Sequence, residues 1–320
     1  MIFEKKIAEA YRATAYTRCD DDGTARYFSA ADFEGLSCHH YPFSAKAGHK
    51  LSGYIYSYDG AKENRLIVFD HGFGGGHRSY MKEIEMLARA GFTVFAYDHT
   101  GCMESGGENT NGMAQSLSDL DSALCEIKAS GRFSGYEISV VGHSWGGFST
   151  LNISALHPDI KSIVAISGFI SVKKLIETNF PGILRPYRKA IMEIEREANP
   201  YYSEFDARES LKKSKCAALL IYSENDKLCK KIHYDLLLEA LSDRPETEFI
   251  LVKDKGHNPN YTKEAVQLLS EFASARAKAI KSESLKTNEE KEAFLLKFDF
   301  DKMTEQDAEV FEKIIEFLNK

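Results

Sequence analysis

The sequence predicts an α/β fold in which helices flank both faces of a mostly parallel, eight-stranded sheet. Its 320 residues are 43% hydrophobic, which is enough for one large domain with an insertion. Short apolar runs alternate along the chain with segments of helical period, an order typical of parallel strands covered by helices. One apolar run ends in the Gly-rich stretch 142–147. Connections of this kind gather at the carboxyl edge of a parallel sheet, where ligands bind.

The N-terminal part of the chain predicts a polar segment followed by a pair of strands. Residues 1–35 are polar and mixed, with one short helix expected to end near Arg12. Residues 36–43 and 50–58 alternate apolar and polar side chains on either side of a turn at 46–49. This alternation predicts two antiparallel strands.

From residue 65 onward the pattern changes to apolar strands and intervening helices. Six further strands are expected, each a short apolar run: 65–69, 92–97, 136–141, 161–167, 217–223 and 247–252. Helical periodicity predicts the helices between and after them: 79–90, 114–130, 148–157, 230–241 and 261–279. Gly91 and Gly131 stand where two of these helices should stop.

The stretch 169–214 breaks this rhythm and predicts a helical lid inserted at the carboxyl edge of the sheet. It contains three prolines and is too long for a simple connection. The core is then expected to comprise residues 36–168 and 215–280. Residues 281–320 predict a charged linker and a C-terminal helical extension with one apolar face.

Composition excludes several classes of protein. A net charge of −7, spread without a basic stripe, argues against nucleic-acid binding. No apolar run approaches about 18 residues, so no membrane span is expected, and the N-terminus lacks the apolar stretch of a secretory signal. The six cysteines form no C-x-x-C pair and fit reduced thiols in the cytoplasm. His39 and His40 are expected on opposite faces of a strand, so no shared metal site is predicted.

Residues 142–147 read Gly-His-Ser-Trp-Gly-Gly and directly follow an apolar strand. A G-x-S-x-G sequence between a strand and a helix is typical of a nucleophile elbow, which exposes a serine hydroxyl above the sheet. Such a sharp turn crowds its neighbours. The positions two before and two after Ser144 are therefore expected to lack a β-carbon, and both are glycine, Gly142 and Gly146.

A serine hydroxyl is a weak nucleophile without an adjacent base, and His257 is the candidate base. It lies in a loop after the last expected strand. A carboxylate must orient the imidazole and stabilise its cation. Asp226, after the preceding strand, is the favoured acid, with Glu224 and Glu177 as alternatives. The chain order serine, aspartate, histidine is the one that a sheet of this type generates when its strand ends supply a triad.

An anionic tetrahedral intermediate needs two preorganised hydrogen-bond donors. The backbone N–H of Trp145, directly after the serine, is one candidate. The backbone N–H of Phe73, within the Gly-rich loop 71–76, is the other. Two nearby histidines are expected to have structural roles: His71 in hydrogen bonding its own loop, and His143 in packing beside the serine.

Together these motifs resemble those of the α/β-hydrolase superfamily, and within it the serine esterase and peptidase branches. The resemblance covers about residues 36–280 and rests on HGFGGG at 71–76, GHSWGG at 142–147, SENDKL at 223–228 and GHNP at 256–259. It implies hydrolysis of an ester, thioester or amide through an acyl-serine intermediate, with no metal or organic cofactor. Two features depart from the pattern. Phe73 replaces the third residue of the HGGG loop of many lipases, and the longer tail implies extra lid contacts or self-association as a homo-oligomer.

The sequence therefore predicts a cytoplasmic serine hydrolase with a small-molecule ester or short peptide as substrate. A carboxylesterase for small to medium acyl groups is favoured. Phe169, Tyr187 and Tyr201 are candidates for the acyl pocket, and the alternative is that they hold the lid to the core. The main rival is an aminopeptidase or prolyl-type peptidase whose lid binds an amine through acidic side chains: Glu193, Glu195, Glu197 and Glu204. Acyl transfer and a non-catalytic binding role are less favoured.

Overall fold

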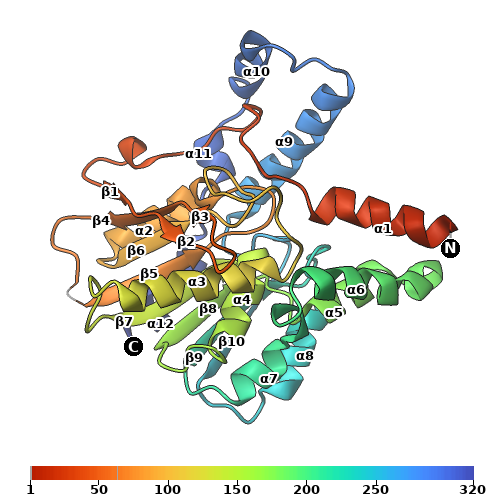
Figure 1. The fold of residues 1–320 in the computed structure, drawn as a ribbon. Helices are drawn as coiled ribbons and strands as arrows, with labels where there is room; N and C mark the ends of the chain where they lie inside the picture. Colours follow the sequence, from red (N-terminus) through yellow and green to blue (C-terminus); the bar gives the residue numbers. More distant parts are fainter. Residues whose placement is uncertain (1, 63) are drawn as a thin grey trace.

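The computed structural model describes residues 2–62 and 64–320, and it confirms the α/β fold with a mostly parallel sheet (Figure 1). Within these residues eight strands form the main sheet in the order β1-β4-β6-β5-β7-β8-β9-β10. The strands from β5 onward pair in parallel, whereas β1 with β4 and β4 with β6 are antiparallel. Their bounds are β1 (Ser37–His40), β4 (Gly53–Ser57), β5 (Arg65–Asp70), β6 (Thr93–Tyr97), β7 (Glu137–His143), β8 (Ser162–Ile166), β9 (Ala217–Ser223) and β10 (Thr247–Val252).

The two N-terminal strands are each broken in two, unlike the continuous strands that the alternation predicts. After β1 the chain continues into β2 (Phe43–Ser44), which pairs with β3 (Lys50–Leu51) in a separate two-stranded sheet. Pro42 lies at the break and has no N–H for the strand ladder. The chain therefore leaves the main sheet there and returns with β4.

One face of the sheet is covered by α3 (Gln115–Ala129), α4 (Trp145–Ile153), α7 (Ala207–Lys212) and α8 (Ile232–Ala240). Side chains of α3 and α4 pack against inward-facing strand residues such as Val140 and Ile163, and all are buried. Because α4 begins directly after β7, this packing fixes the turn between them.

The opposite face is covered by α2 (Met81–Arg89), α9 (Lys263–Lys281), α11 (Phe300–Met303) and α12 (Ala308–Asn319). The apolar side chains of α12 that periodicity places on one face are buried against this side of the sheet: Val310, Phe311, Ile314, Phe317 and Leu318. Lid side chains such as Ile176 and Ile191 belong instead to the cluster on the first face. The apolar face of the C-terminal helix is thus used against the sheet.

The charged stretch 281–292 differs from the expected linker. Helix α9 extends to Lys281, and α10 (Asn288–Leu295) begins after a short turn. Thr287 caps α10, and the Glu290 carboxylate accepts from the backbone N–H of Thr287 in return. This reciprocal capping stabilises a helix start within a segment that is rich in charge.

Besides α7, the insertion at 169–214 contains α5 (Val172–Asn179), the 3₁₀ helices η3 (Gly182–Tyr187) and η4 (Tyr202–Glu204), and α6 (Arg188–Ala198). Helix α1 (Ile2–Ala15) lies beside α6 (Figure 1). The carboxylate of Glu195 on α6 accepts from the hydroxyl of Tyr11 at 2.6 Å and from the backbone N–H of Met113 at 2.8 Å. The N-terminal segment therefore packs against the lid.

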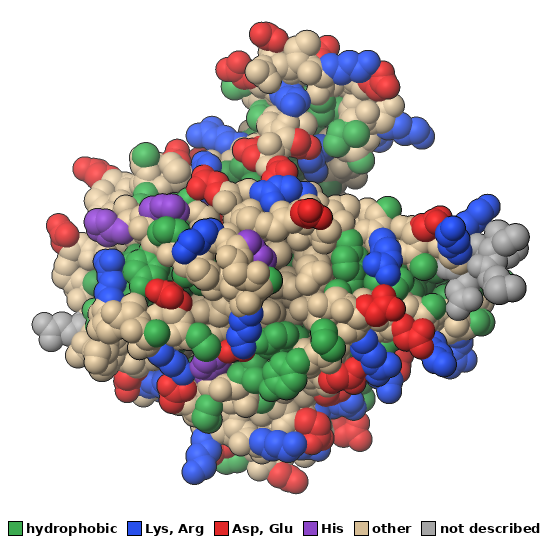
Figure 2. Space-filling model, viewed as in Figure 1, with side chains coloured by type: hydrophobic (Ala, Val, Ile, Leu, Met, Phe, Trp, Pro, Cys, Tyr) green, Lys and Arg blue, Asp and Glu red, His purple; other side chains and the backbone are tan. Residues whose placement is uncertain are grey.

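In the part of the chain that is described, the helices are all too short or too polar to cross a bilayer. On the face drawn in Figure 2, lysine and arginine side chains are interspersed with aspartate and glutamate side chains.

Candidate active site

Ser144 lies at the sharp turn between β7 and α4, in a backbone conformation that is rare for a residue with a β-carbon. Its φ is 57° and its ψ is −108°. Its N–H donates to the carbonyl of Ile166 on β8 at 2.8 Å, which holds the turn against the sheet. A β-carbon on Gly146 would overlap the backbone of Asp70, and one on Gly142 would overlap Gly146. The strained turn is therefore sterically possible only with these two glycines.

The structure brings Ser144, His257 and Asp226 into one hydrogen-bonded chain. Nε2 of His257 lies 2.8 Å from Oγ of Ser144, and Nδ1 lies 2.8 Å from Oδ2 of Asp226. The other carboxylate oxygen of Asp226 accepts from the backbone N–H groups of Leu228 and Cys229, at 2.8 and 3.0 Å. These two bonds fix the orientation of the carboxylate toward the imidazole.

The two alternative acids occupy other positions. Glu224 is exposed. Glu177 lies on α5, 2.5 Å from the ammonium group of Lys174. Of the three carboxylates considered from the sequence, Asp226 is the one that contacts His257.

The loop that carries His257 is held by a residue that the sequence reading did not single out. Oδ1 of Asn225 accepts from the backbone N–H of Gly256 at 2.9 Å and from the hydroxyl of Ser223 at 2.8 Å. Asn225 therefore ties the loop after β10 to the loop after β9. In the sequence, its position directly before Asp226 is the one indication that it lies near the site.

His143 connects three loops of the site. Its Nε2–H donates to the carbonyl of His257 at 2.8 Å, and its Nδ1 accepts from the hydroxyl of Tyr80 at 2.8 Å. That hydroxyl accepts from the backbone N–H of Gly72 at 3.1 Å. Burial, together with the neighbouring His257, lowers the pKa of His143 to about 3, so the ring is neutral. It packs beside the serine, as expected, and it also orients the loop of the base.

The two expected oxyanion donors lie on adjoining segments. Trp145 is the first residue of α4, where a backbone N–H has no acceptor within its own helix. The rings of Phe73 and Trp145 pack edge to face, with centroids 5.2 Å apart. His71 accepts from the backbone N–H of His99 at Nε2 and donates from Nδ1 to the carbonyl of Gly72. Burial and His99 lower the pKa of His71 to about 3, so it orders this loop as a neutral ring.

A buried cation lies beneath these segments. Nε2 of His99 is 2.8 Å from Asp70, and Nδ1 is 3.3 Å from Asp119. Although burial opposes the charged form, the two carboxylates raise the pKa of His99 to about 10. The ring lies 4.7 Å from that of Trp145. This ion cluster therefore supports the residue that follows the serine.

The three candidate acyl-pocket residues lie in different surroundings. Phe169 is buried and stacks on Phe148, with centroids 4.6 Å apart, one turn of α4 beyond Ser144. Tyr187 is half-buried against the core cluster of the first face. Tyr201 is 59% exposed and lines a surface hollow with Ala155, beyond the carboxyl end of α4. Tyr201 thus lies at the opposite end of that helix from Ser144.

The acidic side chains of the lid are engaged with other groups. Glu195 is fully buried, and burial raises the pKa of its carboxyl group. The other three form ion pairs at the surface: Glu193 with Lys189, Glu197 with Arg12, and Glu204 with Arg196. The expected acidic cluster is therefore dispersed.

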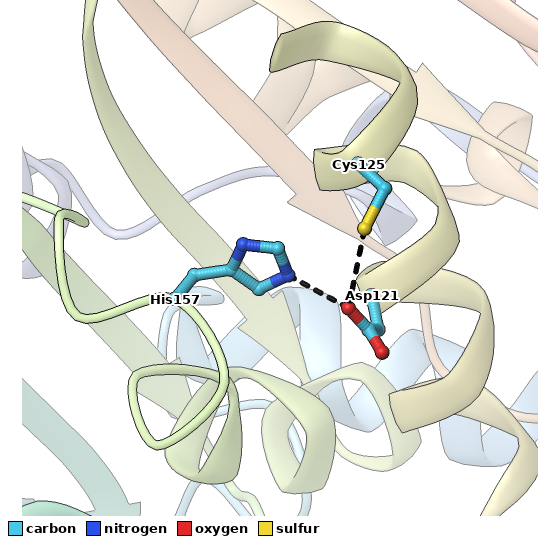
Figure 3. A group of neighbouring side chains, drawn as sticks. All are labelled: Asp121, Cys125 and His157. Atoms are coloured by element: carbon cyan, nitrogen blue, oxygen red, sulfur yellow. Dashed lines mark hydrogen bonds and ion pairs between the residues drawn. The ribbon is translucent and has the colours of Figure 1, made fainter. Parts of the chain in front are cut away.

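Asp121, Cys125 and His157 form the one group of potential metal ligands found in the described residues (Figure 3). Nε2 of His157 donates to Asp121 at 2.8 Å, and the hydroxyl of Tyr202 donates to the same carboxylate at 2.7 Å. Although burial opposes ionisation, His157 and Lys46 hold the pKa of Asp121 well below its usual range. The potential ligand atoms already form hydrogen bonds, and a lysine ammonium group lies beside them. The group is therefore better explained as a hydrogen-bonded connection between α3 and the lid than as a metal site.

Comparison with known proteins adds a family model and a set of similar folds. The model described as "Serine aminopeptidase, S33" matches residues 61–204. No curated protein sequence matches the chain.

Several solved structures share the fold. An esterase of Pyrococcus furiosus is 20% identical with a TM-score of 0.60, over 83% of this chain and 98% of its own. An esterase of Butyrivibrio proteoclasticus with bound ferulic acid is 16% identical with a TM-score of 0.56, over 74% of this chain and 99% of its own. An acylaminoacyl peptidase of Pyrococcus horikoshii is 18% identical with a TM-score of 0.56, over 71% of this chain and 38% of its own. Esterases and peptidases alike are therefore built on this fold.

Proposed function

We propose that the chain is a member of the α/β-hydrolase superfamily and that it acts as a serine carboxylesterase on small to medium acyl groups. The observation that carries the proposal is the hydrogen-bonded chain from Ser144 through His257 to Asp226. A disused site would have no chemical need to keep these three side chains in contact, which speaks against a purely binding role.

In the proposed mechanism Ser144 attacks the ester carbonyl while Nε2 of His257 accepts its proton. Asp226 holds the other ring nitrogen as N–H and stabilises the imidazolium that forms. His257 then returns the proton to the departing alcohol, which leaves an acyl-serine. Water enters next, gives its proton to His257, and releases the acid as the serine is reprotonated.

The negative charge of the tetrahedral intermediate is proposed to lie between the N–H groups of Phe73 and Trp145. The position of Trp145 at the start of α4 supports this role, because its N–H is free and the positive end of the helix dipole lies there. His71 and His143 hold the two segments in place through hydrogen bonds. Because both rings are neutral, they place no extra charge beside the oxyanion.

The arrangement of the lid supports the proposal of an ester substrate over a peptide with a free N-terminal amine. Recognition of an ammonium group is helped by a cluster of carboxylates, whereas Glu195 is buried and the other three acidic side chains of the proposed lid are dispersed in surface ion pairs. A peptidase remains the second candidate, because the matching family model describes a serine aminopeptidase.

A panel of p-nitrophenyl esters of rising acyl length, beside aminoacyl and prolyl anilides, tests the proposal. We expect turnover of the shorter esters, with Ser144→Ala folded but inactive. A fluorophosphonate probe should label the wild type at Ser144 alone. Turnover confined to the anilides would assign a peptidase, and a Ser144→Ala variant with wild-type turnover would overturn the assignment of the serine.

A cytoplasmic setting and a small-molecule substrate are part of this proposal. The six cysteines are free thiols in the structure, which is consistent with a reducing compartment.

A further inference from the structure

Cys19 and Cys102 face each other across a parallel β-bridge outside the main sheet. The N–H of Cys19 donates to the carbonyl of Gly101 at 2.9 Å, and the N–H of Met103 donates to the carbonyl of Cys19 at 3.0 Å. Residues paired in this way have Cα atoms about 4.8 Å apart. A disulfide spans Cα atoms between about 4.4 and 6.8 Å apart, so the backbone already meets this requirement.

Both sides of the bridge are firmly held. The guanidinium group of Arg18 donates to the carbonyls of Met103, Ser105 and Gly107 at 2.6–3.0 Å. Gly101 has a φ of 69°, and a β-carbon there would overlap the backbone of Asn109. The two thiols are therefore kept together by structure on both sides.

The two thiols differ in a way that suits stepwise oxidation. A hydrogen bond from Cys102, with a further one from the backbone of Gly74, lowers the pKa of Cys19 to about 7 against the effect of burial. The same hydrogen bond and burial raise the pKa of Cys102 well above its usual value. Cys19 is 9% exposed, whereas Cys102 is fully buried. Cys19 is thus the more acidic and the less buried of the two thiols, with its resolving thiol beside it.

A hollow of about 290 Å³ opens beside the pair, and Asp20 and Met103, the residues that follow the two cysteines, contribute to its lining. Its other acidic residues, Asp21, Asp98 and Glu104, outnumber its single basic residue, Arg78. An acidic lining disfavours an anionic oxidant such as glutathione disulfide and admits a small neutral one.

We propose that Cys19 and Cys102 form a peroxide-sensitive thiol pair that closes into a disulfide and thereby slows the enzyme. The Cys19 thiolate attacks one oxygen of hydrogen peroxide, the O–O bond breaks, and a sulfenic acid and hydroxide form. The Cys102 sulfur then attacks the sulfenic sulfur. The S–S bond forms, the S–O bond breaks, and the Cys102 proton leaves with the hydroxyl group as water. Two thiols lose two electrons and two protons in total, and one peroxide becomes two waters.

The pair is connected to both oxyanion segments. The backbone N–H of Gly74, which directly follows Phe73, helps to lower the pKa of Cys19. The N–H of Cys102 donates to the carbonyl of His99, whose ring packs on Trp145. Disulfide formation joins the segment of Cys19 covalently to the segment that follows His99, and we expect this to shift both oxyanion segments. We expect turnover to fall about tenfold, less than the hundredfold or more that loss of a whole oxyanion donor causes.

The bond itself is tested on the full chain without reference to activity. Protein is treated with hydrogen peroxide, its remaining thiols are alkylated, and peptides from combined tryptic and chymotryptic digestion, which separates Cys102 from Cys125, are identified by mass spectrometry. We expect a cross-linked pair of peptides containing Cys19 and Cys102, lighter by two hydrogens than their sum, that dithiothreitol separates. The exposed thiols of Cys38 and Cys125 are the internal comparison. If they oxidise while Cys19 and Cys102 both remain alkylatable, the proposal fails.

The effect on rate rests on the proposed hydrolase activity and is measured separately. Wild type and a Cys38→Ser control should lose ester turnover with peroxide and regain it with dithiothreitol. Cys19→Ser and Cys102→Ala should keep their turnover under the same treatment. A peroxide loss of the same size in a folded Cys19→Ser variant would overturn the link to the oxyanion segments. A cross-link in a protein that turns over no substrate would support the thiol pair and refute only the proposed function.

Discussion

Replacement of Asp226 by asparagine gives a sharp test of the site, because the structure dictates how the new amide must lie. Oδ1 of Asp226 accepts two backbone N–H groups, from Leu228 and Cys229. In Asp226→Asn that position must hold the amide oxygen, so the amide NH₂ faces Nδ1 of His257. The imidazole must then accept at Nδ1 and carry its proton on Nε2. A protonated Nε2 cannot take the proton of Ser144.

The expected loss follows from this wrong tautomer. The same exchange in another serine triad lowers kcat about 10⁴-fold, which corresponds to about 5 kcal/mol of transition-state stabilisation. The assay is single-substrate kinetics with p-nitrophenyl butyrate, with thermal unfolding measured in parallel. We expect a change of less than about 1 kcal/mol in stability, since all three hydrogen bonds of the side chain are retained in altered form.

The two other carboxylates provide matched controls. Glu224→Gln lies two residues away and is exposed, and Glu177→Gln removes the other acid considered from the sequence. Both should keep wild-type kcat. Asp226→Asn with a loss under about tenfold, or a loss in Glu177→Gln of the size expected for Asp226→Asn, would refute the assignment of the orienting acid.

Three further predictions test the supporting structure. Tyr80→Phe leaves two buried partners unsatisfied, so we expect about 1–3 kcal/mol less stability and about a tenfold lower kcat, measured by thermal unfolding and ester kinetics; unchanged values of both would contradict the link through His143. His99 has its pKa raised to about 10, so its contribution is fully present below an unfolded value of about 6.5 and is lost as pH rises through 10. His99→Gln should therefore flatten the fall in unfolding free energy over that pH window, by at most about 5 kcal/mol, and a slope equal to that of the wild type would exclude a buried cation. Glu195→Ala removes the acceptor that joins α1, the lid and the loop before α3, so we expect a melting temperature several degrees lower and a higher KM; no change in either would show that this anchor is dispensable.

The order of strands and helices followed from the sequence because each buried strand is a short, wholly apolar run. The same logic placed Ser144, Asp226 and His257 at strand ends, where a parallel sheet brings distant residues together. The contact between these three side chains follows from the order of the strands in the sheet, which the sequence pattern predicts.

Other features depended on contacts between distant segments and left a weaker local signal. Tyr80 lies 63 residues from His143, and nothing near it in the sequence marks a hydrogen-bond partner. The sequence predicts Glu195 as one of four lid acids available to bind an amine, yet it stands four residues after Ile191 on the buried side of α6. The position of Glu195 on the apolar side of the helix indicated that it is buried. Its charge suggested the opposite. The break at Pro42 was also visible, because proline cannot continue a strand ladder.

The C-terminal extension contributes to the site through the loop that carries His257. Lys255, two residues before the histidine, forms an ion pair with Asp307 at 2.5 Å, and the Lys255 side chain is only 8% exposed. Beyond the histidine, the backbone carbonyl of Asn260 accepts from the N–H of Asp307 at 2.7 Å, and Tyr261 forms a bridge with Gln306. The loop is thus fastened to the extension on both sides of the base. Because α12 is itself anchored in the core of the second face, the tail gives His257 a rigid support that α9 alone would not supply.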